Sequence, residues 1–585
     1  MYSSSITYRR GEIGQMKIFE LLNRRERRLI TLAIIRSILS IALEIAALTI
    51  FVVLSSYLVS INGGAELNGL RLTLFSLLSL GSDSDSASTA ILLSEITAIY
   101  FIKNLVGYSN VVFVNRIIAS VQNRVAEDLY FKFFRLPYVS INSINTTEAS
   151  ASLIDSMNFA IAGRISFLIL GLVEVANILT ILTFLSSQSI QITISLILFS
   201  LSLLAFSYRK LRHRAHRNGL DLYQSTVSSR IYFSQGKDSI SIFTLSGRIP
   251  FFLDNLNKER KRFTFAYLNS ISLQQLPKYL IESYLLLSLG FLYLASELFI
   301  DTESSTIFIL LFILAGMRIL PSITRLQSLW LGMADSKHRI DTFQHIYNRV
   351  IQENSDLVSS ETHRTPMPPD LRIERVVGKD LNFFYGEKCV IENLNFEIRN
   401  GSPALIRGAS GSGKSTLINM IAGLINPTSG SIKYYLSDGT IVEAASMPFS
   451  IGYVPQHPII FKGSLVYNVL LKSELDQDDK NHLLKSMKFV DDIGVFPIDS
   501  WEVDSIEAGG SNLSGGERQR ISIARAVALE SQVIIMDEPT NSLDNSSSTE
   551  IMRNIHAHSR NERKIVVSTT HQSELHKMFK NIIDL

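Results

Sequence analysis

The stretch Gly408-Ala-Ser-Gly-Ser-Gly-Lys-Ser-Thr416 decides the fold of the C-terminal part of this chain, because it fits the pattern GxxxxGK[ST]. Glycines in this pattern let backbone N–H groups turn toward a phosphate, and the lysine reaches the β- and γ-phosphates. The preceding residues, Ala404–Arg407, indicate a short buried strand, and the following residues, Leu417–Leu424, indicate the first turns of a helix. This order predicts a phosphate-binding loop in which the Ser415 hydroxyl can ligate Mg²⁺.

An acidic pair follows a second predicted strand. The apolar run Val533–Met536 is suited to a buried parallel strand, and it ends in Asp537-Glu538. An acid at the end of such a strand, close to the phosphate-binding loop, can hold Mg²⁺, and a second acid can orient or deprotonate an attacking water. We therefore expect Asp537 to be a metal ligand and Glu538 to be the general base of a nucleotide hydrolase.

A third motif, Leu513-Ser-Gly-Gly-Glu-Arg-Gln-Arg520, lies between these two. In this order the three motifs resemble the nucleotide-binding domain of an ABC ATPase. In that family the Ser-Gly-Gly segment lies at a helix N-terminus and binds the γ-phosphate of ATP held by the other subunit. Free N–H groups and the positive end of a helix dipole suit such a contact. The resemblance therefore implies ATP as the ligand and a second ATPase domain facing this one.

The resemblance extends to three further positions. Tyr385, in the segment Leu381–Gly386, matches the aromatic residue that stacks on adenine; the alternative is an ordinary strand aromatic. Gln456, in the segment Ile451–His457, matches the glutamine that contacts Mg²⁺ and the water. His571 follows an apolar strand, as does the family's switch histidine, which contacts the γ-phosphate and the catalytic glutamate.

Together these motifs define a candidate site with ATP and Mg²⁺ as its ligands. The nucleotide-binding candidates are Tyr385, Gly408, Ala409, Ser410, Gly411, Ser412, Gly413, Lys414, Ser415, Thr416, Ser514, Gly515 and Gly516. The catalytic candidates are Glu538, His571 and Gln456, and the candidate Mg²⁺ ligands are Ser415, Gln456 and Asp537. Heterodimeric exporters often degrade one of their two sites. The intact set therefore favours a homodimer, and the active half of a heterodimer stays open.

Three stretches depart from the pattern of ABC exporters. Asn541-Ser-Leu-Asp544 has Asn and Ser where exporters commonly carry Ser and Ala, and the nearby Pro539 replaces their typical alanine; neither change is expected to touch a reacting atom. Glu507 stands one place before the position of a glutamate that in exporters contacts the membrane domain, and Ala508 occupies that position. The sequence ends at Leu585, directly after the expected strand Asn581–Asp584, where the family commonly has further turns and a helix. The second departure affects the expected coupling contact rather than the ATP site.

The composition indicates a membrane protein. Of the 585 residues, 46% are hydrophobic and 19% are charged, and the mean hydropathy is +0.21. These values are high for a soluble protein. The net charge of +3 gives no case for nucleic acid as a partner. The single cysteine, Cys389, permits no intramolecular disulfide and indicates neither a metal cluster nor a catalytic nucleophile.

Apolar stretches predict six membrane spans. They cover residues 35–61, 88–118, 160–186, 189–208, 279–296 and 306–320. Lysine and arginine concentrate in the N-terminal segment and in 116–159 and 209–278, so the positive-inside rule places both termini in the cytoplasm. Glu282 and Arg318 interrupt the last two stretches, which leaves a count of four or five spans open. We expect a multi-pass protein of the bacterial cytoplasmic (inner) membrane.

Six spans followed by an ATPase domain resemble a half-transporter of the type IV ABC exporters. The resemblance implies a membrane α-helical bundle of six transmembrane helices followed by an α/β P-loop ABC ATPase domain. The expected divisions are a cytoplasmic segment, the transmembrane domain, a helical extension with linker, and the ATPase domain, at 1–34, 35–330, 331–370 and 371–585. By the same analogy, coupling helices are expected near Ser140–Thr147 and Lys237–Phe243.

Several ionisable residues lie within the predicted spans. They are Glu44, Glu95, Lys103, Arg164, Glu174, Glu282 and Arg318. Because charge in hydrocarbon is costly, such residues need partners or a wet cavity. One interpretation is structural pairing between helices, or snorkelling near a helix end. The other is a polar lining for a substrate, for which Glu174 and Glu282 are the better candidates.

The resemblance implies ATP-driven export or flipping of a substrate by a dimer. Mostly short outer loops and the segment Leu320–Arg325 resemble the lipid-linked oligosaccharide flippases, so we favour such a lipid-like substrate. An exporter of peptides, of the antimicrobial or self-immunity type, is the alternative. Outside the transporters, an ABC ATPase that regulates or remodels partners stays open, although six spans argue against it. The expected partners are a second half-transporter subunit, membrane lipid and the transported substrate, without nucleic acid.

Overall fold

The computed structural model describes residues 22–61, 85–188, 190–299, 302–357, 371–447, 449–472 and 505–585, with the single positions 481, 483, 486, 487 and 503. The chain divides into two compact units. The first comprises Met1–Leu136 with Ser143–Asn354, and the second comprises Pro137–Asn142 with Ser355–Leu585. Most of the predicted segment 1–34, most of the outer loop before the second span, and the linker at 358–370 lie outside the described residues.

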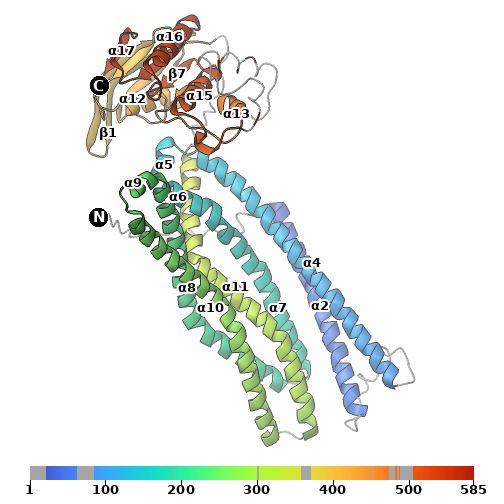
Figure 1. Ribbon diagram of the computed structural model, residues 1–585. Coiled ribbons are helices and arrows are strands. Elements are labelled where there is room, and N and C mark those ends of the chain that lie inside the picture. Colours follow the sequence, from blue (N-terminus) through green and yellow to red (C-terminus); the bar gives the residue numbers. More distant parts are fainter. Residues whose placement is uncertain are drawn as a thin grey trace. The chain divides into compact units, whose positions relative to one another are not determined.

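The described part of the first unit is helical (Figure 1). Its long helices are α2 (Arg24–Ile61), α4 (Asp85–Phe134), α7 (Arg164–Gln188), α8 (Ile190–Asp238), α10 (Ile249–Phe299) and α11 (Thr302–Leu357). Its short helical segments are α6 (Thr146–Ser150), the π-helical η1 (Ala151–Ser156) and η2 (Phe159–Gly163), and α9 (Ile240–Leu245). Helix α2 lies along α4, and α8 lies along α10 (Figure 1).

The start of α2 shows how local sequence and tertiary contact combine in this unit. Asn23 and Glu26 form a reciprocal cap, in which the Glu26 amide donates to Asn23 Oδ1 at 2.7 Å and the Asn23 amide donates to Glu26 Oε2 at 2.9 Å. Such a pair satisfies two N–H groups that the first helical turn leaves without intrahelical partners. Arg124 of α4 then binds both oxygens of the buried Glu26 carboxylate, at 2.9 and 2.8 Å. The cap therefore also ties α2 to α4.

Three helical stretches among the described residues are long and apolar enough to cross a membrane. They are Arg24–Ala47, Leu93–Phe134 and Thr146–Phe184. The other predicted spans, at 189–208, 279–296 and 306–320, lie in α8, α10 and α11, and the count of six stays a prediction. As predicted, α4 runs without a break from the second span through residues 119–130.

The second unit contains two sheets. A parallel sheet has the order β6-β7-β8-β3-β9, and an antiparallel sheet has the order β2-β1-β4-β5. The strands are β1 (Ile373–Tyr385), β2 (Lys388–Arg399), β3 (Ala404–Arg407), β4 (Ser429–Leu436), β5 (Ile441–Glu443), β6 (Ile451–Val454), β7 (Val533–Met536), β8 (Ile565–Thr569) and β9 (Asn581–Asp584). The helical segments are α5 (Tyr138–Ser143), α12 (Lys414–Ile421), η4 (Ala444–Ser446), α13 (Leu465–Leu470), η6 (Ala508–Gly510), α15 (Gly515–Ala528), α16 (Asn545–Asn561) and α17 (Ser573–His576).

Apolar side chains on both faces of the parallel sheet form the core of this unit. Every residue of β7 and β8 is buried, which is why both strands read as uninterrupted apolar or small runs in the sequence. One cluster joins the two sheets, and the other packs the parallel sheet against α13, α15 and α16. The carboxyl ends of β3, β7 and β8 therefore meet at one rigid edge. Open α/β sheets bind their ligands at this edge.

The predicted coupling helices overlap two short helices. The first expected range, Ser140–Thr147, overlaps α5, and the second, Lys237–Phe243, overlaps α9. Compactness groups Pro137–Asn142, most of α5, with the second unit. The coupling role of both helices stays a prediction.

Candidate ATP site and transmembrane cavity

The loop between β3 and α12 takes the conformation that its glycines allow. Gly411 and Gly413 have φ angles of 81° and 100°, a region that L side chains rarely adopt. A Cβ on Gly413 would lie 2.8 Å from Cγ1 of Val390, so this position has no room for a side chain. Helix α12 begins at Lys414, three residues before the predicted first turn, so the loop leads directly into a helix N-terminus. The N–H groups of that first turn have no intrahelical partners and suit a phosphate.

Lys414 lies inside this loop. Its Nζ donates to the carbonyl oxygens of Gly408 and Ala409 at 3.0 and 2.9 Å, and its side chain is buried. The Ser412 hydroxyl is also buried and has no hydrogen-bond partner among the described residues. A buried ammonium, a hydroxyl in need of a partner and open N–H groups together fit a bound phosphate.

Oxygen groups suited to Mg²⁺ lie beside the loop. The Ser415 hydroxyl donates to Asp537 Oδ2 at 2.8 Å, and the second oxygen, Oδ1, accepts a hydrogen bond from Thr569 Oγ1 at 2.8 Å. A hydroxyl and a carboxylate at this spacing are hard ligands of the kind that Mg²⁺ takes alongside phosphate oxygens. The residues present therefore fit the ion.

Glu538 is the convergence point of the site. His571 Nε2 lies 2.8 Å from its Oε1, Gln456 Nε2 donates to its Oε2 at 3.0 Å, and the Asn541 amide donates to the same oxygen. Its backbone N–H donates to Thr569 Oγ1 at 2.9 Å, and the residue is only 7% exposed. Its φ of 50° is uncommon for a residue with a side chain, and these contacts hold it there.

The parallel register explains how these side chains meet. Val454 pairs with Met536, and Met536 pairs with Ser568, so β6, β7 and β8 end at the same level. Three neighbouring strands therefore bring their functional residues to the same level: Gln456 follows β6, the acidic pair follows β7, and Thr569 ends β8. Strand β8 separates β7 from β3, and Ser415 at the start of α12 reaches Asp537 across it.

Two titratable residues near the site have shifted pKa values. Burial, with the nearby Asp537 and Tyr138, raises the pKa of Tyr453 in β6 to about 12. Asp544 lies at the N-terminus of α16, where hydrogen bonds from the side chains of Ser546 and Ser547 and from the Ser547 amide lower its pKa. The first shift shows that negative charge is disfavoured beside the acidic pair. The second shows a carboxylate held ionised as a helix cap.

The structure corrects one expectation and adds one residue. Asn541 was expected to touch no reacting atom, but its amide contacts the carboxylate of Glu538, so that expectation is wrong. The side chain reaches back because Thr540 and Asn541 form a turn directly after the acidic pair, with the Asn541 N–H bonded to the Glu538 carbonyl. Thr569 was not singled out from sequence, although its place at the end of the strand before His571 is a usable signal.

Ser514 caps α15, as predicted for a helix N-terminus. Its hydroxyl accepts from the Glu517 amide at 3.2 Å, and Glu517 Oε2 accepts from the Ser514 amide at 2.7 Å. Gly515 and Gly516 form the first turn against the segment 541–544: a Cβ on either would lie 3.3 to 3.4 Å from Ser542. Their small size therefore keeps this helix end open. Binding of the partner's γ-phosphate there stays a prediction.

Tyr385 lies apart from these groups, at the end of β1. Its side chain is 58% exposed and packs edge to face on Phe383, with ring centroids 4.9 Å apart. An exposed ring next to Gly386 has a free face for stacking, which is compatible with the adenine role and does not test it. Glu507 accepts a hydrogen bond from Ser511 at 2.6 Å, and Ala508 begins η6.

The helical unit contains a cavity of about 810 Å³. Three of the charged residues singled out within the predicted spans line it, namely Glu44, Lys103 and Glu174. Lys103 forms an ion pair with Glu44, and Arg325 Nε lies 3.1 Å from Glu174 Oε1. Arg325 also lines the cavity but was not singled out. Structural pairing between helices, the first interpretation of these charged residues, thus explains the presence of Lys103 and Glu44.

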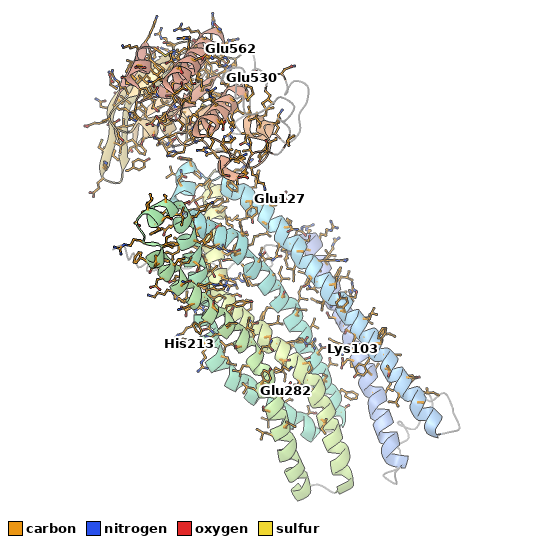
Figure 2. All side chains as sticks on the ribbon, viewed as in Figure 1. Lys103, Glu127, His213, Glu282, Glu530 and Glu562 are labelled. Carbon is orange, nitrogen blue, oxygen red and sulfur yellow. The ribbon has the colours of Figure 1, made fainter. Side chains whose placement is uncertain are left out.

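Glu282, the other expected lining residue, does not line this cavity. Lys103 lies on α4 and Glu282 lies on α10 (Figure 2). The Glu282 side chain is exposed, whereas Glu174 is buried. The sequence treats the two glutamates alike, and the structure separates them.

Comparisons with known proteins agree with these observations. Residues 391–541 match the sequence model of the ABC transporter family. Mycobactin import ATP-binding/permease protein IrtB of Mycolicibacterium thermoresistibile is 34% identical over 206 residues, 35% of this chain and 34% of that protein. Transport/processing ATP-binding protein ComA of Streptococcus pneumoniae is 27% identical over 399 residues, 64% of this chain and 53% of that protein. The matched stretches thus span between a third and just over half of these relatives.

A solved structure matches nearly the whole chain. A bacterial Atm1-family ABC exporter with ATP bound has a TM-score of 0.73 and 16% sequence identity, and the match covers 96% of this chain and 94% of that one. This likeness extends the fold beyond the ATPase domain to the helical unit, and the predicted fold class is confirmed. The chain thus carries an ATP-binding ABC transporter domain toward its C-terminal end and has the fold of an ABC exporter half-transporter.

Proposed function

We propose that this chain is one half of an ATP-driven exporter in a membrane. One observation carries the proposal: Gln456, Asn541 and His571 converge on Glu538, whose neighbour Asp537 is bonded to Ser415 of the phosphate-binding loop. This arrangement supports ATP hydrolysis. A multi-pass helical unit with a polar cavity in the same chain supports the use of that hydrolysis for transport.

Each group of residues in the site has its own role in ATP hydrolysis. The loop N–H groups and Lys414 bind phosphate, and the ammonium can exchange its two carbonyl partners for phosphate oxygens. Ser415, Asp537 and Gln456 would hold Mg²⁺, which when bound neutralises charge developing on the phosphates. Glu538 accepts the proton of the attacking water, and the hydrogen bonds to its two oxygens orient its carboxylate. His571, half exposed, can reach a γ-phosphate.

The half-transporter fold implies pairing with a second half-transporter. We propose a homodimer, because this chain carries both the phosphate-binding loop and the open helix end at Ser514–Gly516. Two copies facing each other would complete two sites. We further propose the bacterial cytoplasmic membrane as its location, with both termini in the cytoplasm, from the distribution of lysine and arginine.

Two substrate classes follow from the sequence. A lipid-linked oligosaccharide, whose linker carries phosphate, was favoured over a peptide. The buried Glu174 carboxylate in the cavity lining, with one oxygen unpaired among the described residues, favours the second, because an anionic linker would be repelled there. An ABC ATPase that acts on partners without transport would need no such cavity.

ATPase activity of the purified chain in lipid nanodiscs tests the proposal. Wild type is compared with Glu538→Gln, and with Glu574→Gln as a matched control, because Glu574 is exposed on α17. We expect Glu538→Gln to bind ATP and to lose turnover by at least about 100-fold, and Glu574→Gln to behave as wild type. Hydrolysis by Glu538→Gln at the wild-type rate would refute the assignment of the base. A well-folded but inert wild type would refute the homodimer and direct the search to a second subunit.

A further inference from the structure

Two buried acceptor atoms in the cavity of the helical unit have no hydrogen-bond partner among the described residues. They are Oε2 of Glu174 on α7 and Oδ1 of Asn110 on α4. Glu174 is 6% exposed and Asn110 is 8% exposed. Buried polar atoms in folded proteins are nearly always paired, so two unpaired acceptors lining one cavity indicate that a donor from outside the protein belongs there.

The groups bonded to these two residues direct their hydrogen bonds elsewhere. Glu174 uses its other oxygen for Arg325, whose own Nε also donates to the Pro321 carbonyl. The Asn110 amide donates to the Ser37 hydroxyl at 2.7 Å, and that hydroxyl in turn donates to the Ala33 carbonyl at 2.9 Å. The Ser37 hydroxyl therefore donates to Ala33 and does not donate to the Asn110 oxygen.

The charges of the lining define the sign of the ligand. Three carboxyl groups, of Glu44, Glu174 and Asp335, line the cavity with two basic groups, of Lys103 and Arg325. Lys103 forms an ion pair with Glu44, and the Arg325 side chain is 63% exposed. Asp335 accepts a hydrogen bond from Ser270, so among the described lining carboxylates Glu174 keeps a buried oxygen without a hydrogen-bond partner. Such a lining attracts a cationic donor and disfavours an anion.

The rest of the lining defines the body of the ligand. Apolar side chains from three helices contribute to the wall: Val111 of α4, Leu170 and Val173 of α7, and Leu329 and Met333 of α11. A volume of about 810 Å³ lies within the range of small-molecule sites, which are mostly apolar with a few polar groups that fix orientation. The cavity therefore suits an amphipathic molecule of drug or short-peptide size.

We propose that this cavity binds a small amphipathic substrate through a protonated amine, for which Glu174 Oε2 and Asn110 Oδ1 are the candidate acceptors, while its apolar body packs on the wall. The proposal rests on the proposed export function, because it names the substrate class of that transporter. The free N-terminus of a short apolar peptide carries this chemistry, and so does a long-chain alkylamine. Acylation converts the amine into a neutral amide, so neither acceptor would then bind a cation.

Ligand pairs on the unaltered protein give the first test. Binding to the ATP-free chain in nanodiscs is measured for a short apolar peptide with a free N-terminus, for its N-acetylated form, and for a long-chain alkylamine. We expect the free peptide to bind at least about tenfold more tightly than the acetylated form. The alkylamine then distinguishes the source: tighter binding of the peptide points to a peptide substrate, and the reverse points to a lipid-like amine. Equal binding of the free and acetylated peptides would overturn the proposal.

A matched pair of variants gives the second test. Glu174→Gln keeps the shape and removes the charge, so it should abolish the preference for the free amine, while Glu282→Gln, on α10 and outside the cavity lining, should retain it. Thermal unfolding checks that both variants fold. Asn110→Leu serves as a second lining variant and should weaken free-peptide binding. Retained preference in Glu174→Gln would overturn the proposal. ATP hydrolysis by the wild-type protein in the same nanodiscs separates the two proposals: no amine preference in the wild type with normal turnover refutes the substrate class alone, and absent turnover refutes the proposed homodimeric transporter.

Discussion

Replacing Thr569 by valine should loosen the acidic pair from β8. The hydroxyl of Thr569, which is fully buried, donates to Asp537 Oδ1 at 2.8 Å and accepts from the Glu538 amide at 2.9 Å. Valine has nearly the same shape, so packing is preserved while both hydrogen bonds are lost. A bond to a charged group contributes ~1.5–3 kcal/mol, and leaving a buried N–H unpaired costs ~1–3 kcal/mol. Together they predict a loss of about 3 kcal/mol of unfolding free energy in the ATPase unit.

Thermal unfolding of the full chain in nanodiscs, followed by the transition of the ATPase unit, measures this loss. For a unit of this size ~3 kcal/mol lowers the melting temperature by about 6–12 °C. Thr540→Val is the matched control, because Thr540 is equally buried and its hydroxyl has no hydrogen-bond partner among the described residues. It should leave the melting temperature unchanged or raise it slightly. Equal shifts in the two variants would show that volume and not hydrogen bonding sets the effect, and would refute the reasoning.

Two further predictions concern the same unit. Asn541→Ser removes one of the two amides that bind Glu538 Oε2. In a steady-state ATPase assay, kcat should therefore fall about tenfold while KM changes by less than about twofold. A raised KM with unchanged kcat would contradict this prediction. Burial and the nearby Arg560 lower the pKa of His556 from 6.5 to about 4. Because this pKa is lower in the folded protein than in the unfolded chain, the unfolded chain binds the proton first as the pH falls. The stability that neutral His556 contributes, about 2–3 kcal/mol, should therefore be present above pH 6.5 and lost between about pH 6.5 and 4, and His556→Leu should flatten that part of a plot of melting temperature against pH.

Local pattern was sufficient for much of the ATPase unit. The strand, loop and helix around Gly408–Thr416, the buried strand before Asp537, and the helix that begins after Ser514 all occur where the sequence predicts them. Each of these features depends on neighbouring residues: glycines that reach positive φ, an apolar run of strand length, and a serine three residues before a glutamate. The fold class was predictable for the same reason, since long apolar stretches followed by these motifs leave few alternatives.

The contacts of Glu538 were only partly predictable. Gln456 and His571 were expected through the family resemblance, whereas the roles of Thr569 and Asn541 were not. Nothing local marks these two residues, because the hydroxyl acts across two strands and the amide acts through a turn. Their effect depends on the register that brings the ends of β7 and β8 to the same level.

The cavity shows most clearly which features the sequence predicts and which depend on the tertiary structure. By itself the sequence determined that charged residues lie within long apolar helices, and hence that they need partners or a wet cavity. It could not separate Glu174 from Glu282, since both are single carboxylates in apolar surroundings. The packing of α2, α4, α7 and α11 around one space placed Glu174 beside Arg325 with one oxygen unpaired, and left Glu282 on an exposed face of α10. Helical periodicity predicts which residues share a face, but which face meets a cavity depends on contacts between helices that are distant in the chain.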